Sequence, residues 1–164
     1  MAHTIEGSNK AHGLRFAIVV SRYHDFVTDR LQAGALEALE TAEVASKDVA
    51  VIKVPGAFEI PLAARRAAET RQFDAIVCLG CVIRGGTPHF EYIASAVANG
   101  LATAAAETGV PMTFGVLTTN SVEEALERAG SQTANKGWEA ASAAVEMATL
   151  MKRLVKHVVP GIPV

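Results

Sequence analysis

One stretch of the sequence decides the fold: Ala75-Ile76-Val77-Cys78-Leu79-Gly80-Cys81-Val82-Ile83-Arg84-Gly85-Gly86-Thr87-Pro88-His89. It opens with a short apolar run rich in β-branched residues, which is typical of a strand buried on both faces. Gly85 and Gly86 then predict a turn where the backbone can approach a ligand closely. Thr87 suits the N-cap of a following helix, and Pro88 suits its first position. We therefore predict a strand, a glycine turn and the start of a helix.

Strand and helix patterns alternate along the rest of the chain. Apolar runs predict strands over residues 15–20, 49–54, 75–83 and 112–117. Apolar residues at helical spacing predict helices over residues 25–42, 59–71, 88–107 and 136–155. A short helix is predicted from Ser121, which forms a capping box with Glu124, to Gly130. Such alternation is typical of an α/β protein whose parallel sheet is covered by helices on both faces.

The ends of the predicted strands indicate where a ligand binds. Ligands of parallel α/β sheets bind beyond the carboxyl ends of the strands. The segments that follow those ends are residues 21–24, 55–59, 84–89 and 118–120. We expect all four segments to line one edge of the sheet.

The length and composition favour one domain over residues 1–164, with a core from about residue 5 to residue 155. A net charge of −2 argues against nucleic acid or an anionic membrane surface as a partner. The apolar fraction of 50% is high for a small domain, so we expect a face to be buried in a homo-oligomer. Neither a signal peptide nor a membrane-spanning run is recognisable, which predicts a cytoplasmic location. Two prolines predict an extended tail over residues 158–164.

Cys78 and Cys81 lie three residues apart in one predicted strand. Side chains at this spacing point to opposite faces, so the two thiols cannot easily share a metal ion or form a disulfide. We interpret both as small buried residues of a reducing compartment. The sequence has no cluster of His, Cys, Asp and Glu with the spacing of a metal site and no P-loop.

The predicted helix start after the glycine turn is a candidate anion site. Free backbone N–H groups at a helix N-terminus favour phosphate. His89 lies beside this position, and a histidine can move protons near neutral pH. The same strand–glycine–helix junction occurs in α/β proteins without catalysis, where such a histidine is a surface or capping residue. The residues by themselves leave both interpretations open.

Other candidate residues lie in or near the segments that follow the strands. Tyr23 and Phe58 either stack on a planar heterocycle or pack in the core. Glu59 either accepts hydrogen bonds from a polyol or an amine, or complements the helix dipole. Arg128 and Lys136 either neutralise a phosphate or are ordinary solvated charges.

Two further phenylalanines differ in their setting. Phe90 adjoins His89 and is expected to pack in the core. Phe114 lies inside a predicted strand rather than at its end. It is therefore a candidate to serve the site of a neighbouring subunit.

Four motifs occur in a fixed order: Val54-Pro55-Gly56-Ala57-Phe58-Glu59-Ile60-Pro61, the stretch 80–93, Phe114-Gly115-Val116-Leu117-Thr118-Thr119, and Glu127-Arg128-Ala129-Gly130 followed by Asn135-Lys136-Gly137. Together they resemble the motifs of the lumazine synthase family of riboflavin biosynthesis. The resemblance extends over nearly the whole chain, from about residue 5 to residue 154. It implies a flavodoxin-like three-layer α/β sandwich with a central parallel four-stranded sheet and a short N-terminal strand.

The resemblance implies a specific transferase reaction. Members of that family condense 5-amino-6-(D-ribitylamino)uracil with 3,4-dihydroxy-2-butanone 4-phosphate to 6,7-dimethyl-8-ribityllumazine, and they release phosphate and water. No cofactor or metal ion is implied. The implied partners are the two small-molecule substrates, further copies of the chain and a riboflavin synthase. The copies would form a pentamer and then a closed shell of twelve pentamers, because the loop 130–136 has the compact length of shell-forming members.

The resemblance also implies a role for each matching residue. His89 matches the proton-transfer histidine, and Arg128 matches the arginine that pairs with the phosphate. The other implied substrate-binding residues are Tyr23 for stacking on the pyrimidine, Ala57, Phe58 and Glu59 for the ribityl chain and the uracil edge, Cys81, Val82 and Ile83 for the pyrimidine, Gly86 and Thr87 for the phosphate, and Phe114 and Lys136 at a subunit boundary.

Two positions depart from the family pattern. Tyr23-His24 stands where Phe-Asn is common, and Gly86 stands where alanine or glutamine is more usual. Neither departure removes a chemical group that the reaction requires. Two other functions fit the same scaffold: a riboflavin synthase that dismutates lumazine, and a non-catalytic shell protein that binds flavin or lumazine.

Overall fold

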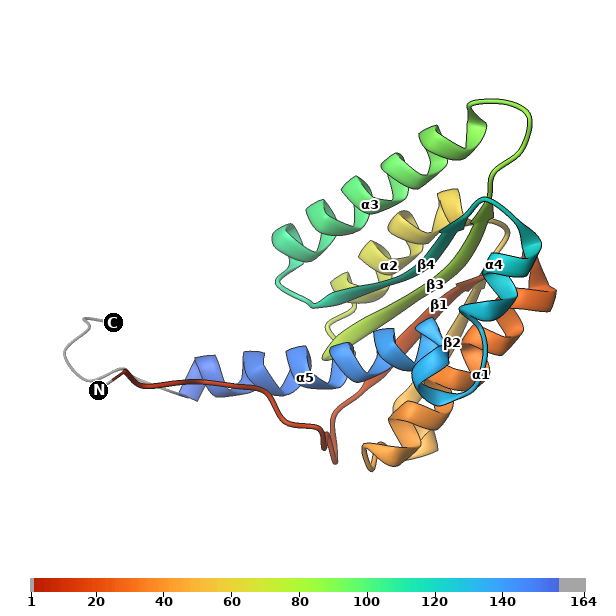
Figure 1. The fold of residues 1–164 in the computed structure, drawn as a ribbon. Helices are drawn as coiled ribbons and strands as arrows, with labels where there is room; N and C mark the ends of the chain where they lie inside the picture. The colour runs from red at the N-terminus through yellow and green to blue at the C-terminus, as the bar shows by residue number, and fades with distance from the viewer. Residues whose placement is uncertain (1, 157–164) are drawn as a thin grey trace.

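Four parallel strands form the central sheet of the computed structural model, which describes residues 2–156 (Figure 1). The strands are β1 (Phe16–Ser21), β2 (Val49–Val54), β3 (Ala75–Ile83) and β4 (Met112–Thr119). Their order across the sheet is β2-β1-β3-β4, and each neighbouring pair is parallel. The predicted strands are therefore confirmed, with ends that differ by at most two residues.

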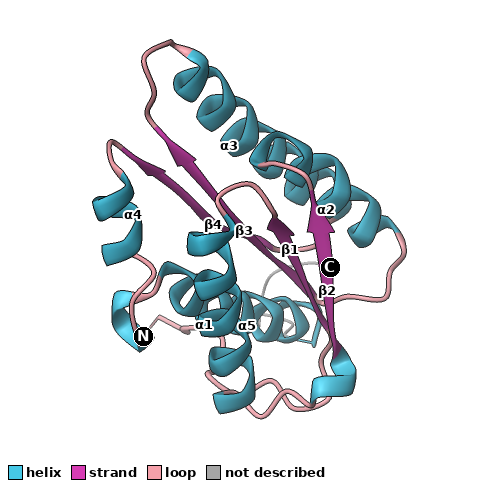
Figure 2. Ribbon diagram, turned by 90° about the vertical axis from the view of Figure 1, so that its right-hand side faces the viewer, coloured by secondary structure: helices cyan, strands magenta, loops and turns pink. Residues whose placement is uncertain are grey.

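Helices cover both faces of this sheet (Figure 2). One layer contains α1 (Asp25–Thr41) and α5 (Lys136–Lys156), and the other contains α2 (Ile60–Glu69) and α3 (His89–Thr108). The short helix α4 (Val122–Glu127) follows β4, and three single turns of 3₁₀ helix are η1 (Ser46–Asp48), η2 (Ala57–Glu59) and η3 (Gln132–Ala134). This is the predicted three-layer α/β sandwich of flavodoxin-like type.

The order of the strands explains the position of each helix. The chain moves from β1 to the edge strand β2 in one direction along the sheet. It then moves in the opposite direction, past β1 to β3 and on to β4. Because βαβ crossovers are right-handed, this reversal puts α1 on one face and α2 and α3 on the opposite face. The segments after β1 and β3 therefore diverge at the carboxyl edge of the sheet, which is where a crevice forms in folds of this type.

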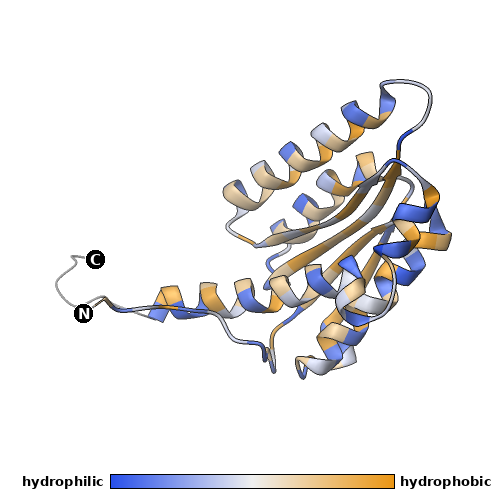
Figure 3. Cartoon of the chain, viewed as in Figure 1, coloured by the Kyte–Doolittle hydropathy of each residue, from blue (hydrophilic) through white to orange (hydrophobic). Residues whose placement is uncertain are grey.

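Alternate side chains of the two central strands enter opposite layers of the core. In β1, Ile18 packs toward α1 and α5, whereas Val19 packs toward α2 and α3. In β3, Leu79 and Cys78 divide in the same way. Figure 3 shows the consequence as apolar strands at the centre, flanked by helices that carry both apolar and hydrophilic residues. The two cysteines therefore lie on opposite faces, as their spacing predicts: Cys78 in the layer of α2 and α3 and Cys81 in the layer of α1 and α5.

The start of α3 differs from the prediction. Helix α3 begins at His89, Pro88 precedes it, and Thr87 makes no capping hydrogen bond from its side chain. The carbonyl of Pro88 instead accepts the first hydrogen bond, from the amide of Glu91 at 3.1 Å. The predicted N-cap at Thr87 is wrong by one residue, because Pro88 takes the half-helical position before the first turn.

The short helix α4 also differs at its end. Ser121 caps it as predicted, since its Oγ accepts from the amide of Glu124 at 3.2 Å. The Glu124 carboxylate, however, accepts from the amide of Asn120 at 2.9 Å, one residue before the position that a capping box requires. Gly130 does not end the helix, because α4 stops at Glu127 and the amide of Gly130 donates to Ala134 in the following loop.

Residues 2–15 contain no strand, so the predicted N-terminal strand is not formed. Within the described residues the sheet consists of β1 to β4, and the N-terminal segment pairs with neither of its edge strands, β2 and β4. The N-terminal segment instead runs beside the far end of α5, where the amide of Ser8 donates to Thr149 Oγ1 at 2.7 Å (Figure 1). The tail predicted to be extended, residues 158–164, lies outside the described part of the chain.

Candidate active site

A cavity of about 840 Å³ lies at the carboxyl edge of the sheet. Its walls come from the end of β3 and from three of the four predicted segments, those that follow β1, β2 and β3. The residues that line it are Tyr23, His24, Gly56, Ala57, Phe58, Glu59, Cys81, Val82, Ile83, Gly85, Thr87, His89, Phe90, Tyr92, Ile93 and Val122. We call it the first cavity. The fourth segment, 118–120, does not line it, and Thr118 lines a separate cavity.

The segment after β1 turns sharply at His24. Its backbone is left-handed, with φ 62° and ψ 48°, and α1 begins at the next residue. The ring of His24 lies 4.2 Å from that of Tyr23 and 5.8 Å from that of Phe26, measured between centroids. Burial lowers the pKa of His24 below its ordinary value and so favours the neutral imidazole. His24 belongs to the segment 21–24 that the strand pattern places at this edge, but the sequence does not indicate its left-handed backbone.

Two aromatic rings and a carboxylate follow β1 and β2: Tyr23 comes after β1, and Phe58 and Glu59 come after β2. The side chains of Tyr23 and Phe58 are 68% and 62% exposed, so these rings are not part of the core. One carboxylate oxygen of Glu59 accepts from the amide of Gly56 at 3.0 Å, which closes the turn after β2. A carboxylate has further acceptor capacity, so Glu59 can support its own turn and still bind a ligand hydroxyl or amine.

Arg84, directly after β3, holds the glycine turn in place. Its Nε donates to Asn120 Oδ1 at 2.9 Å, and its guanidinium pairs with the Glu91 carboxylate at 3.1 Å. The guanidinium also lies 4.7 Å from the centre of the Phe90 ring, which packs partly against the α2/α3 layer. One side chain thus connects the end of β4 to the first turn of α3. This contact was missed in the sequence, where its only signal is a cation between a strand and two glycines.

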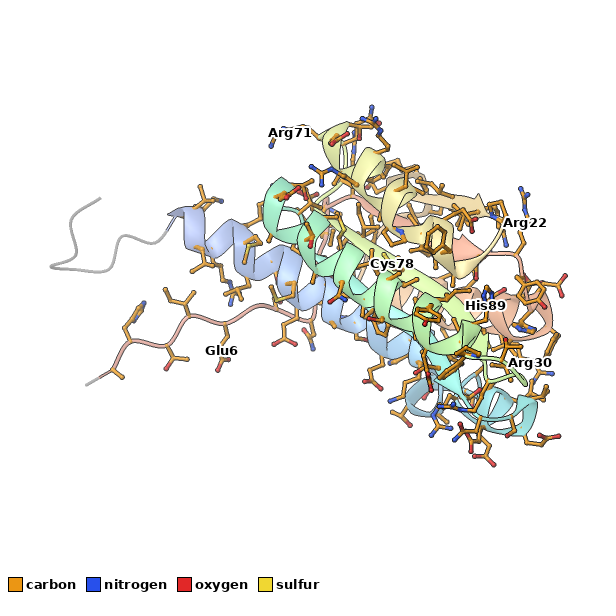
Figure 4. All side chains as sticks on the ribbon, turned by 90° about the horizontal axis from the view of Figure 1, so that it is seen from above. Glu6, Arg22, Arg30, Arg71, Cys78 and His89 are labelled. Atoms are coloured by element: carbon orange, nitrogen blue, oxygen red, sulfur yellow. The ribbon has the colours of Figure 1, made fainter. Side chains whose placement is uncertain are left out.

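His89 is the first residue of α3 and its side chain faces the first cavity. It is exposed, and Figure 4 shows it toward the same end of the molecule as Arg22 and away from Glu6. A Cβ added to Gly85 or Gly86 would meet nothing within 4 Å, so internal packing does not require glycine at either position. Accessible backbone N–H groups in this loop can bind an anion, and the neighbouring histidine can transfer protons to or from the same ligand.

The structure does not bring all the predicted site residues together. Phe114, Arg128 and Lys136 line a second cavity of about 260 Å³ along β4 and the start of α5. Arg128 is fixed there by a hydrogen bond from its guanidinium to the carbonyl of Glu124 at 3.1 Å, and Lys136 Nζ pairs with Glu139 at 2.8 Å. The two cavities have no lining residue in common, so one chain by itself does not complete the predicted site.

Residues 2–156 contain neither a metal-binding cluster nor a membrane-spanning helix. No three or more His, Cys, Asp or Glu side chains of this part are grouped so that they could hold a metal ion. None of its helices combines the length and the apolarity that crossing a membrane requires. The first and second cavities are therefore the candidate places for the chemistry.

Comparison with known proteins identifies similar sequences over almost the full length. A family model described as 6,7-dimethyl-8-ribityllumazine synthase matches residues 13–152. A curated protein of Syntrophus aciditrophicus (strain SB), named 6,7-dimethyl-8-ribityllumazine synthase, is 50% identical to this chain over 154 residues. The alignment covers 94% of this chain and 100% of that relative. Both matches include the residues of the two cavities.

Burial should make the thiol of Cys81 react slowly and with a steep dependence on pH. Burial raises its pKa to about 11 and raises that of Cys78 further. The reactive thiolate is therefore scarce at neutral pH, and the rate of alkylation by iodoacetamide should rise about tenfold per pH unit between pH 7 and 9. Mass spectrometry of the native protein should find label on Cys81 before Cys78, because only Cys81 lines a cavity.

Cys81→Ser provides the control for this experiment and should remove the early label. Unfolding in guanidinium chloride should expose both thiols and abolish the difference between them. Rapid labelling of Cys81 at pH 7 would contradict the burial of this side chain.

Proposed function

Because the chain belongs to the 6,7-dimethyl-8-ribityllumazine synthase family, we propose that its two cavities are complementary halves of one active site. The protein is an enzyme of riboflavin biosynthesis that forms 6,7-dimethyl-8-ribityllumazine. In this proposal the first cavity of one chain is completed by the second cavity of a neighbouring copy. The observation that carries it is the division of the site residues between two separate cavities of the same chain.

The proposed substrates are 5-amino-6-(D-ribitylamino)uracil and 3,4-dihydroxy-2-butanone 4-phosphate. The 5-amino group attacks the ketone of the butanone and forms an imine, and one water leaves. Removal of the proton next to the imine expels phosphate and leaves an enol, which becomes a ketone. The ribitylamino nitrogen attacks this ketone, a second water leaves and the ring closes. Every step is an addition of nitrogen to a carbonyl, an elimination of water or phosphate, or a proton transfer, so the reaction has no net oxidation and needs no redox cofactor.

The first cavity fits the uracil substrate. We assign Tyr23 to the pyrimidine face, since its exposed ring borders the cavity. The backbone of Cys81, Val82 and Ile83 at the end of β3 borders the same space and is assigned to the polar edge of the pyrimidine. Ala57, Phe58 and Glu59 are assigned to the ribityl chain, whose hydroxyls suit the free acceptor capacity of the Glu59 carboxylate.

The glycine turn and the neighbouring chain are assigned to the phosphate. Backbone N–H groups at Gly86 and Thr87, before the first turn of α3, are suited to bind its oxygens. Arg128 of a neighbouring copy would supply a fork of charge-assisted donors, with Phe114 and Lys136 beside it. His89, which borders the first cavity, is assigned to proton transfer during imine formation and phosphate release. Much of the rate would come from holding the two substrates together.

One assay tests the activity and separates it from the two alternatives. The purified protein is mixed with both substrates, and the appearance of lumazine is followed by its absorbance. The proposal is supported if lumazine forms from the two substrates and no riboflavin forms from lumazine alone. Turnover of lumazine alone would identify a dismutating riboflavin synthase instead. Binding of lumazine without any turnover would identify a non-catalytic binding protein.

Loss of His89 should slow the reaction without abolishing it. General acid–base groups contribute roughly 10²- to 10⁴-fold, whereas catalysis by proximity survives their removal. His89→Ala should therefore lower kcat and leave the KM of both substrates nearly unchanged in steady-state assays. His12→Ala is the matched control, because His12 is exposed and lies in neither cavity. An unchanged kcat in His89→Ala would exclude this residue from the mechanism.

Loss of Arg128 should weaken the binding of one substrate selectively. A charge-assisted hydrogen bond contributes about 1.5–3 kcal/mol, which corresponds to a KM increase of roughly 10- to 150-fold. Arg128→Ala should raise the KM of the butanone phosphate in this way and affect that of the uracil far less. Arg66→Ala, on the outer face of α2, should change neither value. Equal effects on both substrates would contradict the assignment of Arg128 to the phosphate.

The assembly is proposed to be a pentamer that closes further into a shell of twelve pentamers. A head-to-tail ring brings the second cavity of each chain to the first cavity of the next one. The side chain of Phe114 is 49% exposed on one chain, which suits burial against a neighbour. A cytoplasmic location, expected from the sequence composition, and an association with riboflavin synthase, implied by the resemblance, remain predictions.

Mass photometry tests this assembly directly. Five chains of 17.2 kDa give particles of about 86 kDa, and sixty chains give about 1,030 kDa. We expect the larger particle at assay concentrations. A particle of pentamer mass would overturn only the shell, whereas an active monomer would overturn the shared site.

A further inference from the structure

Arg128 and Lys136 lie on the two sides of a short loop at the second cavity. The amide of Lys136 donates to the carbonyl of Arg128 at 2.8 Å, and Ala129 and Asn135 form an antiparallel bridge above it. The amide of Gly130 donates to the carbonyl of Ala134 at 3.0 Å and closes the loop. The spacing of the two cations therefore depends on how residues 129–135 are held.

The side chain of Asn135 is the buried polar group of this loop, with 3% of the residue exposed. Its Oδ1 accepts from the amides of Gly137 at 2.8 Å and Trp138 at 3.1 Å, which caps the N-terminus of α5. Its Nδ2 donates to the carbonyl of Gly130 at 2.8 Å and to that of Arg30 on α1 at 3.0 Å. Both donors and the acceptor of the amide are thus fully used.

Helices α1 and α5 pack so closely around the Asn135 side chain that its amide cannot move. A Cβ added to Gly34 on α1 would overlap the side-chain atoms of Asn135, and one added to Gly137 would overlap the carbonyl of Leu31. Residues 130–134 are exposed, and Gln132 has a left-handed φ of 42°. The exposed part of the loop is therefore attached to the packed pair α1 and α5 at Asn135.

We propose that Asn135 is a positioning residue for the second cavity. Its two donated hydrogen bonds hold the loop on α1 and so set the position of Arg128 relative to Lys136. The ligand that Arg128 and Lys136 would bind is a phosphate monoester. Binding such a group through more than one oxygen requires cations at a defined spacing. This inference rests on the proposed function, in which Arg128 pairs with the phosphate of the butanone substrate.

The capping role and the positioning role of Asn135 can be separated by substitution. Asn135→Ser keeps an oxygen that can cap α5 but has no amide group to reach Gly130 and Arg30. Thr149→Ala is the matched control, because Thr149 lies on the same helix far from the second cavity and also supports a backbone segment, at Ser8. Both variants should lower the midpoint of thermal unfolding, so loss of stability alone cannot distinguish them.

The discriminating measurements are the KM of each substrate and the affinity for inorganic phosphate by titration calorimetry. Asn135→Ser should raise the KM of the butanone phosphate and the Kd of inorganic phosphate by about three- to tenfold, the effect of one or two neutral hydrogen bonds. The KM of the uracil should not change. Thr149→Ala should change none of these values. Gly34→Ala, which displaces the Asn135 amide and removes no loop side chain, should shift the phosphate values in the same direction.

A double substitution shows whether Asn135 acts through Arg128. Asn135→Ser should add little to the loss of phosphate affinity in Arg128→Ala, because the positioned group is already absent. If Arg128→Ala weakens phosphate binding and Asn135→Ser does not, the positioning role is wrong and the proposed function stands. If Asn135→Ser weakens it and Arg128→Ala does not, Asn135 does not act through Arg128 and both assignments fall.

Discussion

Strand β3 is covered by helices on both faces and hydrogen-bonded to a strand on each side, and the rest of the molecule is arranged around it. Eight of its nine residues are buried. A parallel sheet leaves no face for solvent, so each of its strands needs helices above and below. The alternation of Val77 and Leu79 with Ile76 and Cys78 supplies both layers of the core from a single strand.

The same strand determines where the chemistry takes place. At its carboxyl end the chain leaves the sheet, and the segments that follow β1 and β2 line the first cavity together with the end of β3. Arg84 then holds the exit in place by contacting Asn120, Glu91 and Phe90 together. His89 borders the cavity because the first turn of α3 is held at this point. The position of the proposed proton-transfer group is thus a consequence of strand order and of one cation at the end of the central strand.

The second cavity depends on a different constraint, the close approach of α1 and α5. Gly34 and Gly137 permit that approach, and the amide of Asn135 fills the remaining space with four hydrogen bonds. Sequence reasoning identified Arg128 and Lys136 only as isolated cations, and their roles came from the family resemblance. It missed Asn135, because a buried asparagine and an exposed one look alike in a sequence. Its importance comes from its hydrogen bonds to the carbonyls of Arg30 and Gly130, and the helix and strand periods of the sequence do not reveal these contacts.

The sequence by itself determined the elements of this protein and the edge where its site lies. Local patterns were sufficient, because strand period, helix period and the glycine turn after Ile83 depend on neighbouring residues. Only the tertiary structure decided the order β2-β1-β3-β4, the left-handed turn at His24 and the start of α3 at His89 rather than after Thr87. It alone separated Phe114, Arg128 and Lys136 from the first cavity. The physical reason is that distances between residues far apart in the chain depend on how the layers pack, and packing acts between elements rather than within them.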